Sequence, residues 1–354
     1  MPEFNQSWPR PAAPRPIVII GAGGIVVDSH MPAYRQAGFE VAGIWNRNPD
    51  RAKAVADQFE IPKVFETLEE VGAQEGVIFD IATSPQVHVD MLNILPDGAP
   101  VLIQKPMGLD LVVADDILAT CRRKNLIAAV NFQLRFAPMM LAIKDAIAKG
   151  FFGTMTDIEV HLNLVTPWHL FPNLVGDPRV EMVAHSVHYI DLIQSLVGAP
   201  KGVFARSYSY PGSKLTDTRT SAILDYGDDL RVTLSINHHH DFGRSHQDSS
   251  IRFEGDKGAA VVKLGVLLDY PRGEPDELWM GPRGGTLSQV PLKGHWFPDA
   301  FELVMANMQR FVAGEDDTLE TSVESAWTTM AIVEACYASA SRPFEAVLPL
   351  PKEL

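Results

Sequence analysis

The sequence predicts an α/β domain with a doubly wound parallel sheet, followed by an α+β domain with a largely antiparallel sheet covered by helices on one face. From residue 17 to about residue 130, apolar strands alternate with helical segments, and a glycine-rich turn directly follows the first strand. From about residue 150, several strands follow one another with turn residues between them. Alternation is typical of parallel sheets with right-handed crossovers, whereas short turns between consecutive strands are typical of antiparallel sheets.

Composition narrows the class of protein. The chain has 354 residues, enough for two domains of ordinary size, with 46% hydrophobic and 21% charged residues. Its net charge of −14 argues against a nucleic-acid or anionic-membrane partner. It contains only Cys121 and Cys336, and no apolar run approaches the ~20 residues that span a bilayer. These features predict a cytoplasmic protein with no disulfide framework, no membrane partner and no nucleic-acid partner.

The chain divides into three predicted parts. Residues 1–16 carry five prolines and no apolar stretch, which predicts a flexible arm. Residues 17–135 hold the alternating strands and helices of the first domain. Residues 136–354 form the second domain.

The predicted strands of the first domain are Ile17–Ile20, Val41–Trp45, Val77–Ile81, Val101–Gln104 and Ile127–Val130. Its helices are expected to open within Asp28–Gln36 and to cover Pro49–Phe59, Thr67–Val71, Gln86–Leu95 and Leu109–Lys124. In the second domain, helices are predicted over Met139–Lys149, Val183–Leu196, Pro298–Val312 and Val323–Ser339. Its predicted strands are Thr156–Val165, Gly202–Tyr210, Arg219–Asp225, Leu230–Asn237, Ser250–Glu254, Ala259–Leu264 and Val266–Tyr270. Thr67 with Glu70, and Thr321 with Glu324, have the spacing of capping boxes.

The glycine turn after the first strand has the form of a dinucleotide cradle. Gly21 allows the tight turn and Gly23 lets the backbone approach a pyrophosphate, while Gly24 and Ile25 lead into the helix. The third glycine of this fingerprint would fall at residue 26, where the chain has Val26. Because that glycine mainly serves helix–strand packing, the turn still predicts an NAD(P) site of the Rossmann type. An ordinary strand–turn–helix connection is the alternative.

The end of the second strand indicates which dinucleotide is expected. Asn46 and Arg47 follow it, and no carboxylate stands where one would accept hydrogen bonds from the adenosine ribose. A guanidinium suits a 2′-phosphate, so NADP is the preferred cofactor and NAD the second choice. The alternative is that Arg47 only caps the following turn.

Polar residues at the end of the third strand are expected beside the ligand crevice. Thr83, Ser84 and Pro85 form a loop there, and His88 stands near the start of the next helix. These four residues are candidates for cofactor binding. A helix-start polar group is the alternative for His88.

The strand over Val101–Gln104 ends in Gln104, Lys105 and Pro106. A lysine at this position can reach a substrate oxygen above the nicotinamide, where a partly desolvated ammonium polarises a carbonyl or stabilises an alkoxide. Gln104 and Lys105 are therefore candidates for the cofactor site, and Lys105 for catalysis. A solvated loop lysine is the alternative.

The segment from His185 to Leu192 places His185 and His188 on one helical face. A histidine can take the hydroxyl proton as a hydride leaves the carbon, so both are catalytic candidates. Core histidines are one alternative. A metal pair completed by other histidines is another, but no thiolate or carboxylate cluster accompanies them, so no metal is expected.

Four motifs in this order resemble the Gfo/Idh/MocA oxidoreductases, a family that includes glucose–fructose oxidoreductase and inositol dehydrogenase. They are the glycine turn, Gln104-Lys105-Pro106 where the family usually has Glu-Lys-Pro, residues 131–138 with Arg135, and His188-Tyr189-Ile190-Asp191. The resemblance extends from residue 17 to about residue 349. It implies a Rossmann domain, an open-faced C-terminal sheet that commonly mediates homodimers or homotetramers, and an active site between the domains. In that site, Lys105 would hydrogen-bond the reacting oxygen and His188 would act as acid/base.

Two departures from the family concern this site. The family commonly has an aspartate four residues before the histidine, where this chain has Ala184. His185 or Glu181 would replace it in orienting the site, or the partner is absent. Gln104 in place of glutamate removes a negative charge beside Lys105.

Arg135, Trp168, His169 and Trp296 are the further candidates for substrate binding. Trp168 and His169 follow the first strand of the second domain, and Trp296 leads into a late helix. Aromatic rings beside polar donors suit a sugar, whose faces are apolar and whose rim is hydroxylated. Core or interface packing is the alternative for both tryptophans.

These features favour an NADP-preferring oxidoreductase that transfers a hydride to or from a monosaccharide, sugar lactone or polyol. A non-catalytic, dinucleotide-binding regulator of the same fold is the alternative, which Ala184 keeps open and Lys105 with His188 disfavours. A third reading is a tightly held cofactor that is oxidised and re-reduced within one cycle.

Overall fold

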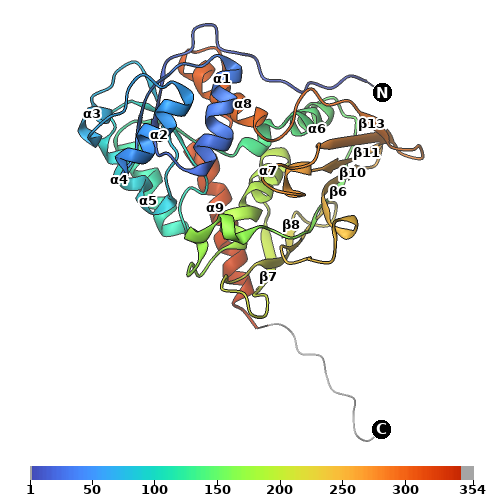
Figure 1. Ribbon diagram of the computed structural model, residues 1–354. Coiled ribbons are helices and arrows are strands. Elements are labelled where there is room, and N and C mark those ends of the chain that lie inside the picture. The colour runs from blue at the N-terminus through green and yellow to red at the C-terminus, as the bar shows by residue number, and fades with distance from the viewer. Residues whose placement is uncertain (1, 344–354) are drawn as a thin grey trace, which may run out of the picture.

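Two β-sheets, one in each half of the chain, organise the fold (Figure 1). They are seen in a computed structural model that describes residues 2–343. The predicted end of the second domain, residues 344–354, lies outside the described residues.

The first sheet is parallel and has the order β2-β1-β3-β4-β5. Its strands are β1 (Ile17–Ile20), β2 (Val41–Trp45), β3 (Ile78–Ile81), β4 (Pro100–Ile103) and β5 (Ile127–Val130). The predicted doubly wound sheet is confirmed, with each strand limit within one residue of the expectation. Short apolar strands of this kind are buried on both faces. Because the strand order reverses at β1, the ligand crevice of this sheet lies at the carboxyl ends of β1 and β3.

The helices of this half follow the strands as expected. They are α1 (Met31–Ala37), which a π-helical turn (Val26–His30) precedes, α2 (Pro49–Phe59), α3 (Leu68–Gly72), α4 (His88–Ile94) and α5 (Leu111–Arg123). Thr67 caps α3 as predicted, since its hydroxyl accepts a hydrogen bond from the Glu70 N–H at 3.2 Å.

The second sheet has the order β13-β12-β11-β10-β6-β9-β8-β7. Its strands are β6 (Met155–Asn163), β7 (Gly202–Tyr208), β8 (Arg219–Asp225), β9 (Arg231–Asn237), β10 (Asp248–Gly255), β11 (Gly258–Lys263), β12 (Glu277–Pro282) and β13 (Ser288–Val290). Neighbouring strands are antiparallel except β6 and β9, which are parallel. The predicted largely antiparallel sheet is confirmed.

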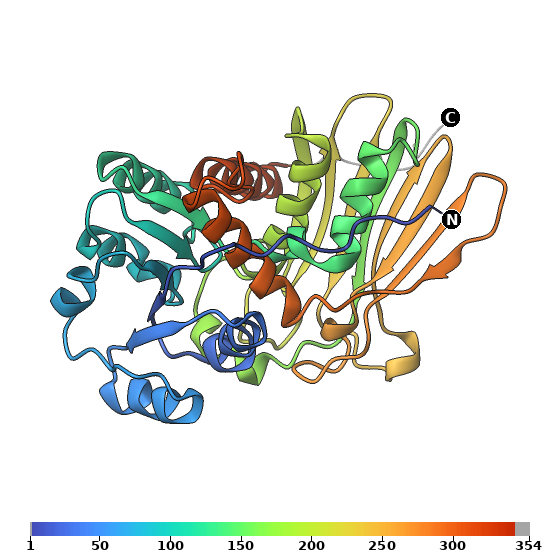
Figure 2. The same ribbon diagram turned by 90° about the horizontal axis from the view of Figure 1, so that it is seen from above.

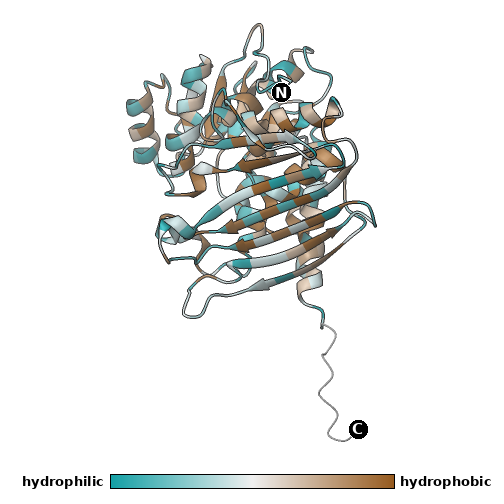
Figure 3. Cartoon of the chain, turned by 90° about the vertical axis from the view of Figure 1, so that its right-hand side faces the viewer, coloured by the Kyte–Doolittle hydropathy of each residue, from teal (hydrophilic) through white to brown (hydrophobic). Residues whose placement is uncertain are grey.

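Helices cover one face of the second sheet and leave the other uncovered (Figures 2 and 3). The helices on the covered face are α6 (Pro138–Ala148), α7 (Val187–Val197) and α9 (Val323–Ala340), whereas α8 (Asp299–Val312) packs against α1 and the first sheet. On the uncovered face, Phe204 and Ile223 form a cross-strand pair and are 69% and 49% exposed. The open-faced sheet implied by the family resemblance is thus observed.

Three local predictions in this half are wrong. The expected strand Val266–Tyr270 is a 3₁₀ turn over Gly265–Leu267. The chain bends there because a Cβ on Gly265 would lie 2.1 Å from the carbonyl oxygen of Glu274, so the two backbones pack closely. Strands β12 and β13 follow instead, and the sequence analysis did not predict them.

The predicted cap of α9 is the third error. Ser322, not Thr321, is the N-cap, and its hydroxyl accepts from the Ser325 N–H. The Thr321 carbonyl accepts from the Val130 N–H at 2.8 Å, which ties this segment to the edge strand β5.

Residues 2–16 have no regular secondary structure and cross the helices of the second domain (Figure 2). Phe4 is 3% exposed, the Asn5 N–H donates to Asp145 of α6, and Arg10 pairs with Glu302 of α8 at 2.8 Å. The sequence predicts a flexible arm here, whereas this segment is anchored at both ends and in its middle.

A buried ion pair fixes the junction of the two domains. Arg135 lies in the 3₁₀ turn after β5 (Gln133–Phe136) and binds Asp191 of α7 through two hydrogen bonds of 2.6 and 2.5 Å. Thr329 of α9 donates to the same carboxylate, and Arg135 also donates to the Glu320 carbonyl at 2.7 Å. Both charged side chains are at least nine-tenths buried. The pair therefore connects three elements that no single domain contains.

We expect Arg135→Met to lower the free energy of unfolding by about 3–5 kcal/mol, because it leaves the Asp191 charge buried without its partner. Urea unfolding at pH 7 measures the change. Lys144→Met is the matched control, since Lys144 pairs with Glu320 but is 45% exposed; it should cost about 1 kcal/mol or less. Equal losses in the two variants would contradict the structural role given to Arg135.

Candidate active site

A trough opens at the carboxyl ends of β1 and β3, where the strand order reverses. Its walls include the glycine turn with Gly23, Gly24 and Ile25, and the loop with Thr83, Ser84 and Pro85. The sequence analysis assigned all six residues to cofactor binding, and the structure brings them together.

The backbone of the glycine turn fits a bound pyrophosphate. Gly21 has φ +123°, and a Cβ on it would lie 2.4 Å from the Ala82 carbonyl oxygen, so only glycine fits between β1 and β3. No atom lies within 4 Å of a Cβ built on Gly23, so the outer side of the turn is open to a ligand. The helix beyond begins as a wide π-turn in which Val26 is fully buried. The cradle is thus intact despite the missing third glycine.

Asn46 and Arg47 stand at the end of β2. The Asn46 carbonyl oxygen accepts from the Ala22 N–H at 3.2 Å, and its amide donates to the Asn48 carbonyl at 3.0 Å. Asn46 thereby holds the β2 loop against the glycine turn. Arg47 is exposed at the same edge.

His88 lies inside the first domain, not on the trough. It is fully buried, and its Nε2 atom lies 3.2 Å from the Thr83 carbonyl oxygen. Burial lowers its pKa to about 4, so the ring is neutral at pH 7. His88 contacts the Thr83 loop from the interior of the domain. It does not line the trough, so its role in this structure is to support the loop and not to contact the cofactor as predicted.

Lys105 lies where the trough meets a second cavity. Its Nζ atom donates to the Ala184 carbonyl at 3.0 Å, across the boundary between the domains. Burial lowers the pKa of Lys105 to about 8. Because this backbone carbonyl is the one acceptor found for the ammonium among the described residues, its other N–H donors are free for a ligand.

Gln104 connects Lys105 to a buried polar network. Its carbonyl oxygen accepts from the Lys105 N–H at 2.8 Å, so its amide nitrogen must be the donor toward His30 Nε2 at 3.3 Å. His30 Nδ1 then donates to Asp80 at 2.7 Å, and the Tyr34 hydroxyl donates to the same carboxylate. Gln104 therefore positions the strand end, and its amide is not free for the cofactor. The sequence analysis missed this network.

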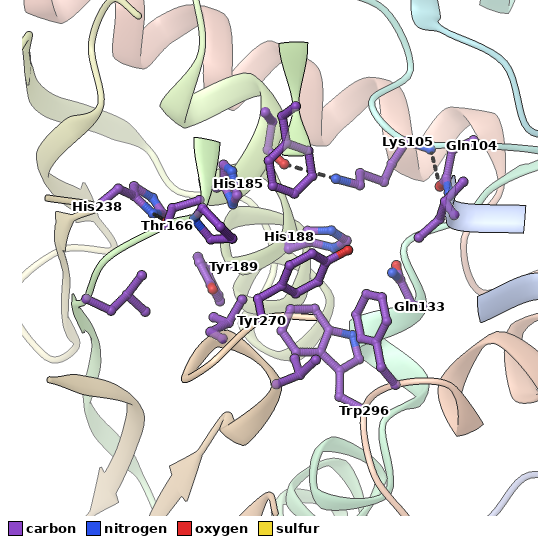
Figure 4. A pocket seen from close by; sticks show the side chains of 18 residues that line it. Gln104, Lys105, Gln133, Thr166, His185, His188, Tyr189, His238, Tyr270 and Trp296 are labelled. Carbon is purple, nitrogen blue, oxygen red and sulfur yellow. Dashed lines mark hydrogen bonds between the residues drawn. The ribbon is translucent and has the colours of Figure 1, made fainter. Parts of the chain in front are cut away.

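The second cavity measures about 240 Å³ and lies between the two domains (Figure 4). Lys105, His185, His188 and Trp296 line it, as the sequence analysis predicted for catalytic or substrate-binding residues. Other lining residues include Gln133, Thr166, Tyr189, His238 and Tyr270. Lys105, His185, Ile25 and Tyr270 line both the trough and the cavity, so the two spaces meet at these side chains.

His188 projects from the first turn of α7 into this cavity. Its ring packs edge-on against Phe132 and Trp296, with centroid distances of 6.3 and 5.5 Å. Its Nδ1 atom is buried and has no hydrogen-bond partner among the described residues. Burial, and then the charge of Lys105, hold the pKa of His188 well below its usual range. The ring is therefore a neutral imidazole with a free nitrogen.

His185 projects from the π-helical turn before α7 (Met182–Ser186). Its ring centroid lies 4.6 Å from that of His238 and 5.5 Å from that of Trp168. Burial, and then the charges of His238, Lys105 and His188, lower its pKa well below the usual value. Several basic side chains thus share one small space.

Glu181 lies behind this group. It is fully buried, accepts from the Ser186 hydroxyl at 2.7 Å and lies 3.6 Å from His238 Nε2. No hydrogen bond joins it, or His185, to His188 in the described part of the chain. Neither residue therefore takes the orienting place of the family's aspartate.

Three predicted substrate-binding residues lie elsewhere. Arg135 points away from the cavity and is fully engaged in its ion pair. His169 is exposed on the loop after β6. Trp168 packs behind His185 and His238 without lining the cavity. The positions of these residues in the sequence could not show in which direction their side chains project.

The residues that sequence reasoning missed come from loops. Tyr270 was assigned to a strand, and Gln133 was quoted only as part of a motif. His238 was considered only as a metal ligand; no group of three potential ligands is close enough to hold a metal among residues 2–343.

The family models match both halves of the chain. An oxidoreductase family model with an NAD-binding Rossmann fold matches residues 15–132, and a GFO/IDH/MocA C-terminal domain matches residues 140–261. Together they cover more than half of the sequence. The chain belongs to the Gfo/Idh/MocA oxidoreductase family.

Curated relatives of this family member include two sugar dehydrogenases. D-apiose dehydrogenase of Rhizobium rhizogenes is 25% identical over 338 residues, which are 91% of this chain and 94% of that enzyme. D-xylose 1-dehydrogenase (NADP(+)) 2 of Haloferax volcanii is 26% identical over 62% of this chain and 68% of that enzyme.

Solved structures show the same fold. An oxidoreductase from Agrobacterium radiobacter, in complex with NAD+, L-tartaric acid and magnesium, superposes with a TM-score of 0.75. It is 21% identical, and the match covers 93% of this chain and 97% of that one. No described helix of this protein is long and apolar enough to cross a membrane.

The Lys105 amine should titrate near pH 8 in the free protein, because its only described partner is a neutral carbonyl. The rate of modification by a limiting amine reagent, followed for each peptide by mass spectrometry, should rise through about pH 8. The matched variant is Ala184→Asp, which puts a carboxylate beside the ammonium and should move the midpoint upward. An identical midpoint in both proteins would contradict the assigned environment.

Proposed function

We propose that this protein is an NAD(P)-dependent oxidoreductase that transfers a hydride between the nicotinamide and a carbon of a monosaccharide, sugar lactone or polyol. The observation that carries the proposal is the junction of the two spaces. Lys105 lies where a dinucleotide trough meets a cavity of about 240 Å³, and His188 projects into that cavity. The sugar dehydrogenases among the relatives support the substrate class.

Each residue has a role that follows from its surroundings. Lys105 has three N–H donors and uses one on Ala184, so the others can hydrogen-bond the reacting oxygen and stabilise its negative charge. His188 is neutral and has an unpartnered nitrogen, so it can accept the hydroxyl proton. When bound, the nicotinamide supplies the hydride acceptor for oxidation or the donor for reduction. The trough would hold the dinucleotide through the turn at Gly23.

Buried aromatic side chains form part of the reacting site. Trp296 is 2% exposed and packs edge-on against His188. Tyr270 lies across the junction from Lys105, as Figure 4 shows. Apolar surroundings of this kind strengthen electrostatic stabilisation relative to bulk water.

Lys105→Met should lower kcat by about 10²–10³-fold, because it removes a donor to the developing charge. Turnover is measured with a panel of aldoses, lactones and polyols and with both dinucleotides. Dinucleotide affinity, followed by fluorescence, should stay nearly unchanged. Lys144→Met, the same substitution on the surface, should retain wild-type turnover. Unchanged kcat in Lys105→Met would overturn the role of this lysine.

We further propose that NADP is preferred over NAD. The support is the exposed Arg47 at the end of β2 and the amide of Asn46 in place of a carboxylate. A guanidinium binds a 2′-phosphate bidentately, whereas a carboxylate would repel it.

Arg47→Ala should reduce the ratio of NADP to NAD affinity by about tenfold, since one charge-assisted contact is lost. The shift in Tm with each dinucleotide measures it. Lys53→Ala is the control, because Lys53 pairs with Asp57 on the exposed side of α2. A ratio that stays constant in Arg47→Ala would show that this arginine only caps the turn.

We also propose that two or four copies associate through the uncovered face of the second sheet. Phe204 and Ile223 are large, apolar and exposed there, and a pair of this kind is typical of an interface. The regulator alternative is less well supported, because the relatives are dehydrogenases and Lys105 and His188 are retained.

A further inference from the structure

The substrate cavity is basic in a protein that is strongly acidic. The chain has 44 aspartates and glutamates against 30 lysines and arginines. The cavity nevertheless has Lys105, His185, His188 and His238 in its wall, and no carboxylate lines it among the described residues. Because the charge of this wall is opposite to that of the whole chain, we infer that the ligand itself needs basic groups around it.

The carboxylates nearest the cavity are engaged by other groups. Glu181 lies behind His238 and accepts from Ser186, and Asp276 accepts from the Trp296 N–H at 2.6 Å. Asp28 lies in the trough, close enough to Tyr270 to contribute to raising the pKa of that phenol after burial has done so. The other titratable group in the wall is Tyr189.

The wall can donate several hydrogen bonds to an anion. The Lys105 ammonium can only donate, and each neutral imidazole donates through one nitrogen. A neutral sugar brings hydroxyl protons that need acceptors, and carboxylates are the strongest of these. A carboxylate ligand brings acceptors only, which the ammonium and the imidazole N–H groups can satisfy.

Without a ligand, the cavity also favours the uncharged forms of its basic groups. Burial lowers the pKa of Lys105 to about 8 and those of His185 and His188 well below the usual value. A bound carboxylate would favour the charged forms of Lys105 and His185. Its binding would therefore take up protons, and its affinity would fall as the pH rises through these pKa values.

We propose that the substrate of this cavity is a polyhydroxylated acid, a sugar acid or aldonate, whose carboxylate is received by Lys105, His185 and His238, while His188 accepts the hydroxyl proton. The proposal rests on the proposed oxidoreductase function and names its substrate class. Glu181 lies behind His238, 3.6 Å from its Nε2 atom, and does not line the cavity.

Matched ligand pairs test the proposal on the full-length protein with saturating reduced dinucleotide, where no alcohol can be oxidised. D-gluconate is compared with D-glucitol, and D-galactonate with D-galactitol, by calorimetry at pH 7. Each acid should bind at least about tenfold more tightly than its neutral partner, as expected for one charge-assisted contact. Titration in two buffers of different ionisation enthalpy should show uptake of about one proton for the acids and none for the neutral ligands.

His238→Gln tests the group itself. Glutamine cannot be protonated, so the wall loses one basic group that can respond to a bound carboxylate, and the preference for the acid should fall to about threefold or less. His185→Gln should reduce the preference as well if the first variant does not fold. His239→Gln is the matched control, because the neighbouring His239 stacks on Tyr210 and is not part of the cavity wall; it should keep the wild-type preference.

Each outcome has one meaning. If the neutral member of each pair binds as tightly as the acid, or if the acids bind without proton uptake, the substrate class is wrong while the oxidoreductase function stands. If the dinucleotide binds but no acid, sugar, lactone or polyol binds or reacts, the proposed function fails and this inference fails with it.

Discussion

The hydrogen bond from Lys105 to the Ala184 carbonyl is the contact on which the site depends, because it joins the two domains at the reacting position. Lys105 leaves the end of β4, and Ala184 belongs to the π-turn before α7. Residues of both domains line the dinucleotide trough, and most of the cavity wall comes from the second domain. The proposed hydride transfer needs both domains, and this hydrogen bond holds them together at the point where the trough meets the cavity. The Arg135–Asp191 pair and the shared core hold the two domains in that arrangement from behind.

Burial gives these side chains their chemical properties. An exposed lysine would stay charged and hydrated, and an exposed histidine would titrate near neutrality. In the cavity, desolvation lowers the pKa of Lys105 to about 8 and that of His188 well below its usual value. A lysine close to losing its proton and an imidazole ready to accept one are thus produced by the same dry space. Burying these ionisable groups costs folding free energy, which the rest of the fold must offset. The buried ion pair of Arg135 and Asp191 belongs to the part of the fold that holds the two domains together.

The fold could be predicted from the sequence further than the site could. The run of apolar residues and the turn residues that flank it determine a strand such as Ile17–Ile20 locally. The limits of the parallel strands were therefore predicted to within one residue. Strands β12 and β13 were missed because they are defined by their pairing with β11 and with each other, which is a tertiary contact. In the site, Lys105 and His188 follow from position at element ends. Arg135 and His88 were misplaced, because a motif shows which residue is present but not to which side it turns. Tyr270 and the network of His30 with Asp80 exist only through tertiary contacts.

The two departures from the family pattern concern the surroundings of one ammonium. Gln104 stands directly before Lys105 where the family usually has glutamate, and Ala184 stands where it commonly has aspartate. Both positions therefore lack a carboxylate, and the ammonium is bonded to the backbone carbonyl of Ala184. Glu181 does not compensate for them, because it lies behind His238 and not on the cavity wall. The wall thus has one lysine and three imidazoles but no carboxylate among the described residues, and the proposed acidic substrate would supply the missing negative charge.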